Sequence, residues 1–291
     1  MRTVSSERQA ESARIHPGAS DPSRQETRMD RRPLLHAVIG EGEPIVLMPG
    51  TITGWVDWLP YAERFAERHM VVCPQLRSIE LIEAGQPIPE TYGVDTEREA
   101  LLATADTLGL DQFDLVGWSS GGHIALMFAL AYPERVRTLT LIEPSAVWLL
   151  RETGRAHDRR EAKRVADIIG AITDKDITVD DLKAFVVRVG LAEPGTDIES
   201  APDWPLMVQN RQSLALIEKE WDHTHTLEHL HALDVPILVV KGTDTVDFMA
   251  AIANGIVANA PNATLLELPG GHTCHLENLD RFLEALDRHL T

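Results

Sequence analysis

The sequence predicts an α/β fold in which helices cover both faces of a mostly parallel sheet and a helical cap is inserted into the chain. Three observations predict it. Short apolar segments alternate with segments of helical periodicity, which is typical of strands buried on both faces. One long stretch, residues 145–233, has helical patterns only. The chain has 291 residues, which is enough for one such domain with an insertion but too few for two full-sized globular domains.

The first part of the predicted sheet begins with an edge hairpin over residues 34–43, where weak alternation is followed by turn residues. Residues 45–48 and 71–74 are continuous apolar runs, the first stopped by Pro49-Gly50, and both predict buried strands. Helical spacing over residues 57–67 predicts a helix between them.

The middle of the chain continues the alternation. An amphipathic helix is predicted over residues 95–108, ahead of Gly109 as a helix stop. A strand over 113–117, a helix of small residues over 121–131 and a strand over 136–142 then follow. Ligands of such sheets bind beyond the carboxyl ends of the strands, so motifs that follow these strands are expected at one edge.

The end of the chain returns to the same pattern after the cap. Its predicted elements are a strand over 236–240, a helix over 248–260, a strand over 264–268 and a helix over 279–290. The predicted organisation is therefore a mobile N-terminal tail over 1–32, a core over 33–144 and 234–291, and a cap over 145–233.

Charge and composition narrow the classes of partner. The net charge is −18, which argues against nucleic acid or an anionic membrane, because both require clustered Lys and Arg. Residues 1–32 lack the apolar segment of a secretory signal, and no apolar run reaches the ~18 residues that span a bilayer. Two cysteines, Cys73 and Cys274, give no disulfide framework and fit a reducing, cytoplasmic location. The sequence leaves open whether the protein forms a homo-oligomer.

The candidate nucleophile is Ser119, in Gly117-Trp118-Ser119-Ser120-Gly121. This stretch fits Gly-x-Ser-x-Gly and lies directly between a predicted strand and a predicted helix, which is the context the motif requires. A turn this sharp strains the backbone of the serine, and its hydroxyl is left at a helix N-terminus that favours an oxyanion. The alternative is a glycine-rich turn without chemistry. A phosphate-binding loop fails because the Gly-Lys-Ser/Thr ending is missing.

With this motif in this context, the sequence resembles the α/β-hydrolase family over residues 34–291, least in the cap. The resemblance implies that His272, which follows Pro269-Gly270-Gly271, is the general base, the alternative being an ordinary loop histidine. It also implies an oxyanion hole made by the backbone N–H groups of Thr51 and Ser120. Thr51 follows Met48-Pro49-Gly50, where the family usually has His-Gly-x. Neither a cofactor nor a metal is expected.

The acid of the triad departs from the family pattern. Thr245 stands where most members carry Asp, and Asp244 lies one residue early. Glu143 ends the strand after the nucleophile helix, and a minority of the family, including dehalogenase-like members and the fungal zearalenone lactone hydrolases, is similar in using Glu there. The chain also shares with the zearalenone group the stretch Pro89-Glu90-Thr91-Tyr92. We favour Glu143, with Asp244 as the alternative acid, and Asp247 or the absence of an acid as the third possibility.

A pocket of apolar character is predicted beside the nucleophile. Its candidate residues are Trp118, Trp148, Trp204, Met207 and Trp221. Large aromatics indicate an apolar, ring-containing substrate, although each one alone is more often part of a core. The family's Asp-x-Arg-Gly-x-Gly-x-Ser after the second core strand is absent here, where only Arg77 matches, so we expect that loop to border the pocket differently.

Four histidines lie close together in the cap, at His223, His225, His229 and His231. Neither Cys nor Glu completes a strong ligand spacing there, so a solvated helix face is expected rather than a metal site.

These residues predict a serine hydrolase that cleaves a carboxylic ester or lactone through an acyl-enzyme on Ser119, acting on an apolar small molecule. The same triad would also serve a perhydrolase, a haloperoxidase-like enzyme or a C–C bond hydrolase. A non-catalytic small-molecule receptor is the alternative of another class. A dehalogenase or epoxide hydrolase is not expected, because those relatives carry Asp where Ser119 stands.

Overall fold

A seven-stranded sheet is the centre of the molecule. The computed structural model describes residues 32–171, 176–216 and 225–290, so nearly all of the predicted tail lies outside the described residues. The strand order is β1-β3-β2-β4-β5-β6-β7. The strands are β1 (His36–Ile39), β2 (Glu43–Met48), β3 (His69–Pro74), β4 (Phe113–Trp118), β5 (Val136–Ile142), β6 (Ile237–Gly242) and β7 (Ala263–Leu268).

The pairing from β3 through β7 is parallel throughout, so the predicted fold class is confirmed. The predicted edge hairpin is wrong in its pairing. β1 runs antiparallel to β3, with Ala37 opposite Cys73, and does not pair with β2. The reason is that β3 and β4 already occupy both edges of β2, which leaves the free edge of β3 for the first strand.

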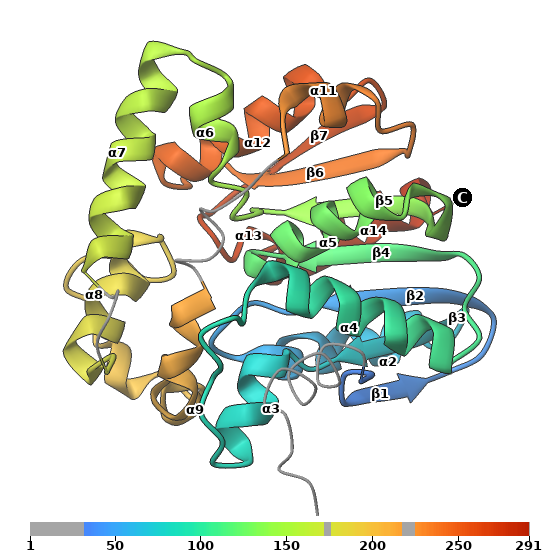
Figure 1. Ribbon diagram of the computed structural model, residues 1–291, viewed down its shortest axis with the longest axis horizontal. Coiled ribbons are helices and arrows are strands. Elements are labelled where there is room, and N and C mark those ends of the chain that lie inside the picture. Colours follow the sequence, from blue (N-terminus) through green and yellow to red (C-terminus); the bar gives the residue numbers. More distant parts are fainter. Residues whose placement is uncertain (1–31, 172–175, 217–224, 291) are drawn as a thin grey trace, which may run out of the picture.

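Helices cover the two faces of the sheet (Figure 1). Around the core they are α2 (Leu59–Phe65), α3 (Arg77–Glu83), α4 (Val94–Thr107), α5 (Ser120–Ala131), α12 (Asp247–Asn259), α13 (Cys274–Glu277) and α14 (Leu279–His289). The buried apolar residues form two clusters, one that includes side chains of α4, α5 and α12 and one that includes side chains of α2 and α14. The first turn of the helix predicted over 57–67 is the 3-10 segment η1 (Gly54–Trp58).

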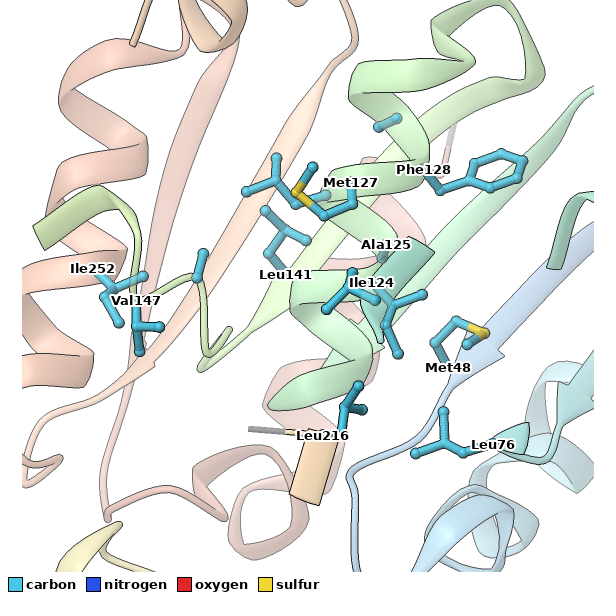
Figure 2. Packing of buried hydrophobic residues seen from close by; sticks show 14 of the residues in the cluster. Met48, Leu76, Ile124, Ala125, Met127, Phe128, Leu141, Val147, Leu216 and Ile252 are labelled. Carbon is cyan, nitrogen blue, oxygen red and sulfur yellow. The ribbon is translucent and has the colours of Figure 1, made fainter. Parts of the chain in front are cut away.

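Helix α5, which begins one residue after Ser119, is the most deeply buried of these helices. Its residues from Ser120 to Ala129 are all buried. Figure 2 shows Ile124 and Met127 of this helix gathered with Leu141 of β5 and with Met48 at the end of β2. Each such side chain contributes about 1.5–3 kcal/mol when it is fully buried. This packing fixes the start of α5 against the strand ends.

Between β5 and β6 the described residues form helices only. They are α6 (Leu149–Glu152), α7 (Ala156–Gly170), α8 (Val179–Arg188), η3 (Ile198–Ser200), α9 (Trp204–Asn210), η4 (Arg211–Leu214) and α11 (Leu227–His231). Helices α7, α8 and α9 lie beyond the carboxyl ends of the strands (Figure 1). This insertion therefore stands where the sheet is expected to bind its ligand.

Helix α3 replaces the loop that the sequence predicts after β3. The carboxylate of Glu97, on α4, accepts hydrogen bonds from the N–H groups of Arg77 at 3.1 Å and Ser78 at 3.4 Å. An acceptor at this end satisfies free N–H groups of the first helical turn and so stabilises the helix. The hydroxyl of Tyr92 also donates to Glu97. Since α3 packs against α9 and η4, the segment supports the cap.

None of the described helices combines the length and the apolar character needed to cross a bilayer. Cys73 and Cys274 are both buried as free thiols.

Candidate active site

Ser119 occupies a sharp turn between β4 and α5. Its backbone has φ 56° and ψ −121°, a conformation that L-residues rarely adopt. Two glycines make the turn possible. A Cβ atom on Gly117 would lie 2.3 Å from the carbonyl oxygen of Gly121, and one on Gly121 would lie 2.4 Å from that of Pro49. The Ser119 N–H donates to Ile142 at 2.9 Å, which ties the turn to the end of β5.

His272 lies on the loop after β7 and faces the serine. Its Nε2 is 3.0 Å from Ser119 Oγ, across 153 residues of sequence, and the imidazole is 1% exposed. The indole N–H of Trp118 donates to the His272 carbonyl oxygen at 3.0 Å. This bond holds the loop to the elbow, the sharp turn between β4 and α5 at Ser119. The distance between Ser119 and His272 is within reach for transfer of a proton between the two side chains.

Glu143 is the carboxylate beside His272. It follows β5 with φ 44°, is wholly buried, and places Oε2 at 3.4 Å from His272 Nδ1. Its other contacts come from the end of β6. The N–H of Gly242 donates to Oε1 at 2.7 Å, and the hydroxyl of Thr245 donates to Oε2. These donors replace the water that the carboxylate loses on burial.

The other two candidate acids lie elsewhere. Asp244 accepts a hydrogen bond from the N–H of Gly270 at 3.2 Å and so braces the loop that carries His272. Asp247 is exposed and lies 3.6 Å from Arg164 of the cap. The structure therefore brings Glu143, rather than Asp244 or Asp247, to the imidazole.

Thr51 and Ser120 meet across the start of α5. The hydroxyl of Thr51 donates to the hydroxyl oxygen of Ser120. The backbone N–H groups of the two residues make no hydrogen bond to other described residues. Two such donors beside a nucleophile can hold the oxyanion of a tetrahedral intermediate.

Two cap residues that sequence reasoning missed hold this region in place. Ser213 Oγ donates to the carbonyl oxygen of Thr51 at 2.6 Å, and Asn210 Nδ2 donates to that of Ile52 at 3.1 Å. Both side chains are wholly buried. Neither belongs to a motif, and both lie in a polar run, residues 209–213, so the sequence does not distinguish them from their neighbours.

A cavity of about 620 Å³, including its mouth, opens above Ser119. Its lining is largely apolar and comprises Gly50, Thr51, Ile52, Thr53, Trp118, Ser119, Ser120, Ser145, Val147, Val165, Ile168, Phe185, Val189, Leu191, Phe248, Met249 and His272. A second hollow, the outer chamber, shares Ile52, Thr53, Trp118 and Leu191 with it. Among the described residues that line either space, none is Lys or Arg.

Acidic groups mark the outer chamber, where Asp57, Asp197 and Asp203 are part of the lining. Burial raises the pKa of Asp57 to about 7, the hydrogen bond from Thr53 opposes that rise, and the charge of Asp203 adds to it. The chamber therefore becomes more negative as the pH rises through about 7.

The predicted pocket residues divide between the cavity and the core. Trp118 lines both spaces and Met207 lines the outer chamber. The structure places Trp148 and Trp204 in the buried core instead, and neither is part of the lining. Trp221 lies outside the described residues.

The histidines of the cap form no metal-binding group within the described chain. His223 lies outside the described residues, and the rings of His225 and His229 are 5.1 Å apart. Groups of three or more metal-ligating side chains are not found among the residues that the structure describes.

His275 supports the site from below. Its ring is buried among aromatic rings, with centroids 5.1 Å from Trp118, 5.9 Å from Trp58 and 5.8 Å from Phe282. Burial, together with the nearby His272, lowers the pKa of His275 to about 3. The ring is thus neutral near pH 7 and acts as a packing partner for Trp118.

A serine hydroxyl beside an imidazole, on a mostly parallel sheet with a helical insertion, defines a hydrolase of the α/β class. Residues 45–285 match the sequence profile of the alpha/beta hydrolase family, and the chain belongs to that family. Nothing in the family match selects a substrate.

Named relatives give more detail. The chain is 34% identical over 107 residues to a 2-hydroxy-6-oxo-2,4-heptadienoate hydrolase of Pseudomonas putida, a match that covers 36% of this chain and 38% of that protein. It is 28% identical over 264 residues to a 2-hydroxy-6-oxononadienedioate/2-hydroxy-6-oxononatrienedioate hydrolase of Burkholderia vietnamiensis, covering 82% and 84% of the two chains. The crystal structure of a hydrolase from Pseudomonas aeruginosa superposes with a TM-score of 0.70 at 21% identity, covering 88% of this chain and 93% of that one, which shows the shared fold.

The buried state of His275 predicts a specific pH dependence of stability. In the unfolded chain a histidine has a pKa of about 6.5. Below that pH the unfolded state binds a proton that the folded state excludes, so stability falls as the pH falls. Between pH 7 and 5 this group removes about 2 kcal/mol of stability. In a His275→Phe variant that loss disappears, as measured by urea unfolding at the two pH values. Because each protein is compared with itself at the two pH values, a difference in packing between the two proteins does not affect the result. An equal loss of stability in both proteins would contradict the prediction.

Proposed function

We propose that this α/β hydrolase cleaves a carboxylic ester or lactone of apolar character through an acyl-enzyme on Ser119. The observation that carries the proposal is the 3.0 Å contact between Ser119 Oγ and His272 Nε2 at the floor of a largely apolar cavity. His272 takes the serine proton as Ser119 attacks the carbonyl carbon. The N–H groups of Thr51 and Ser120 stabilise the oxyanion.

The second half of the reaction uses the same groups. The protonated His272 gives its proton to the leaving alkoxide, and the acyl group stays on Ser119. His272 then accepts a proton from water as the water attacks the acyl-enzyme, and returns it to Ser119 Oγ as the acyl–oxygen bond breaks and the acid leaves. Glu143 is the acid that orients the imidazole and stabilises its charged form, since it contacts Nδ1 on the far side of the ring from Ser119.

The charge of the cavity favours a neutral substrate over the substrates that the relatives are named for. A dienoate and a dienedioate carry one and two carboxylates. The described lining of this cavity offers neither Lys nor Arg to bind them, and Asp57 and Asp203 line the outer chamber, which shares part of its lining with the cavity. An uncompensated carboxylate would be costly to transfer into such a space. C–C bond cleavage of a carboxylated dienone is therefore the less favoured reaction for this chain.

The substrate class is tested with p-nitrophenyl esters of rising chain length beside simple and macrocyclic lactones. Turnover of an ester or lactone is expected, and Ser119→Ala should lower kcat by on the order of 10⁶-fold while the melting temperature is retained. Turnover of a vinylogous diketone, or peracid formation, without any ester or lactone hydrolysis would refute the proposal. A folded protein whose Ser119 also fails to react with a fluorophosphonate would instead be a ligand receptor.

The acid assignment predicts unequal effects of two isosteric substitutions. Glu143→Gln removes the charge beside His272 and should lower kcat by on the order of 10⁴-fold. The matched control is Asp244→Asn, whose side-chain oxygen can still accept the Gly270 N–H, and its kcat should stay within about tenfold of the parent protein. A large loss in the Asp244 variant with little loss in the Glu143 variant would reverse the assignment.

Asp57 predicts a pH-dependent preference against anionic substrates. Its carboxyl group loses its proton as the pH rises through about 7. The ratio of kcat/KM for p-nitrophenyl butyrate to that for the p-nitrophenyl monoester of succinic acid should therefore rise about fivefold between pH 6 and 8. Asp57→Asn should flatten this rise. If the ratio changes equally in both proteins, the outer chamber does not select substrates by their charge.

A further inference from the structure

Thr245 stands at the place where the family usually carries its acid, yet it still contacts the acid of this site. Its hydroxyl donates to Glu143 Oε2, the same oxygen that lies 3.4 Å from His272 Nδ1. Thr245, in the segment after β6, and His272, in the loop after β7, thus contact the same oxygen atom of Glu143. Sequence alone shows Thr245 only as the residue that displaced an aspartate.

We propose that Thr245 is a positioning residue for the triad acid, and that its hydroxyl fixes the carboxylate of Glu143 against His272. This inference rests on the proposed function, because it assumes that Ser119 is activated by His272. It goes further by assigning a role to a residue that is not part of the cavity lining.

The need for such a group follows from the geometry of Glu143. A glutamate has one more rotatable bond than an aspartate, so its carboxylate costs more conformational entropy to hold in place. The contact with His272 is long, at 3.4 Å, whereas the Gly242 N–H lies 2.7 Å from Oε1. Groups of β6 and the turn after it therefore determine where the carboxylate lies, and the imidazole adds little to that choice.

Of the two donors that hold Glu143, the Gly242 N–H and the Thr245 hydroxyl, only the hydroxyl can be removed by a side-chain substitution. Within the described residues, Glu143 accepts hydrogen bonds from the backbone of Gly242 and from two side chains, Thr245 and His272. Arg and Lys make no ion pair with Glu143 in the described part of the chain. Without the hydroxyl, one oxygen of a buried carboxylate would depend on His272 alone.

The first experiment compares Thr245→Val, which keeps the shape and removes the hydroxyl, with Thr245→Ser, which keeps the hydroxyl. The rate of Ser119 labelling by a fluorophosphonate and the kcat for the best ester should fall roughly tenfold in the valine variant. KM should stay unchanged, because Thr245 does not line the cavity. The serine variant should recover most of the rate. A role in folding alone would lower the melting temperature without this division between kcat and KM.

The second experiment moves the acid. Because Thr245 Oγ1 and His272 Nδ1 contact the same oxygen of Glu143, a carboxylate placed at position 245 would lie close to the imidazole. The double variant Glu143→Gln with Thr245→Asp should label at least tenfold faster than Glu143→Gln alone. The glutamine amide can donate to the new carboxylate, so the contact between the two positions is kept.

The outcomes separate this inference from the proposed function. A wild-type protein whose Ser119 is not labelled overturns both. A labelled wild type with an equally fast Thr245→Val variant overturns this inference alone. Equal losses in the valine and serine variants also overturn it, since the hydroxyl would then be irrelevant. Slower labelling in the valine variant, recovery in the serine variant and rescue in the double variant support it.

Discussion

The close approach of the β4–α5 turn to the end of β2 is the constraint on which the site depends. The main chain at Gly121 comes so near the carbonyl oxygen of Pro49 that no side chain fits between them. This contact places Ser120 next to Thr51, where the two hydroxyl groups are hydrogen-bonded, and holds Ser119 at φ 56°. The apolar packing of α5 maintains the strain, because the helix cannot move away without exposing a fully buried face.

The hydrogen bonds around Glu143 depend on position in space and not on position in the sequence. Glu143 arrives from β5 with φ 44°, and its two oxygens are held by Gly242 and Thr245 of the neighbouring strand end. A parallel sheet brings adjacent strand ends together, so two neighbouring strands offer almost the same location for a carboxylate. Asp244, the alternative acid, braces the histidine loop instead.

Much of the fold and the turn at Ser119 could be predicted from the sequence, because local sequence patterns encode them. The strand–helix alternation predicts the sheet and most of its helices, and the glycine spacing around Ser119 predicts the elbow. The pairing of β1 and the formation of α3 were not predictable, because one depends on which sheet edge is free and the other on a buried carboxylate, Glu97, distant in sequence. The roles of Asn210 and Ser213 were hidden for the same reason, as each contacts a backbone carbonyl more than 150 residues away.

The bonds from Ser213 and Asn210 to the carbonyl oxygens of Thr51 and Ile52 have a consequence for how this protein can evolve. Insertions in the cap position would be interchangeable modules if they only shaped the substrate space. Here the module also braces the backbone at Thr51, which in the proposed mechanism faces the developing negative charge. A transplanted cap that lacks these two donors would leave two buried acceptors unsatisfied. If the proposed mechanism holds, a change in the cap that alters the substrate range also alters the catalytic rate, so the two properties are coupled in this protein.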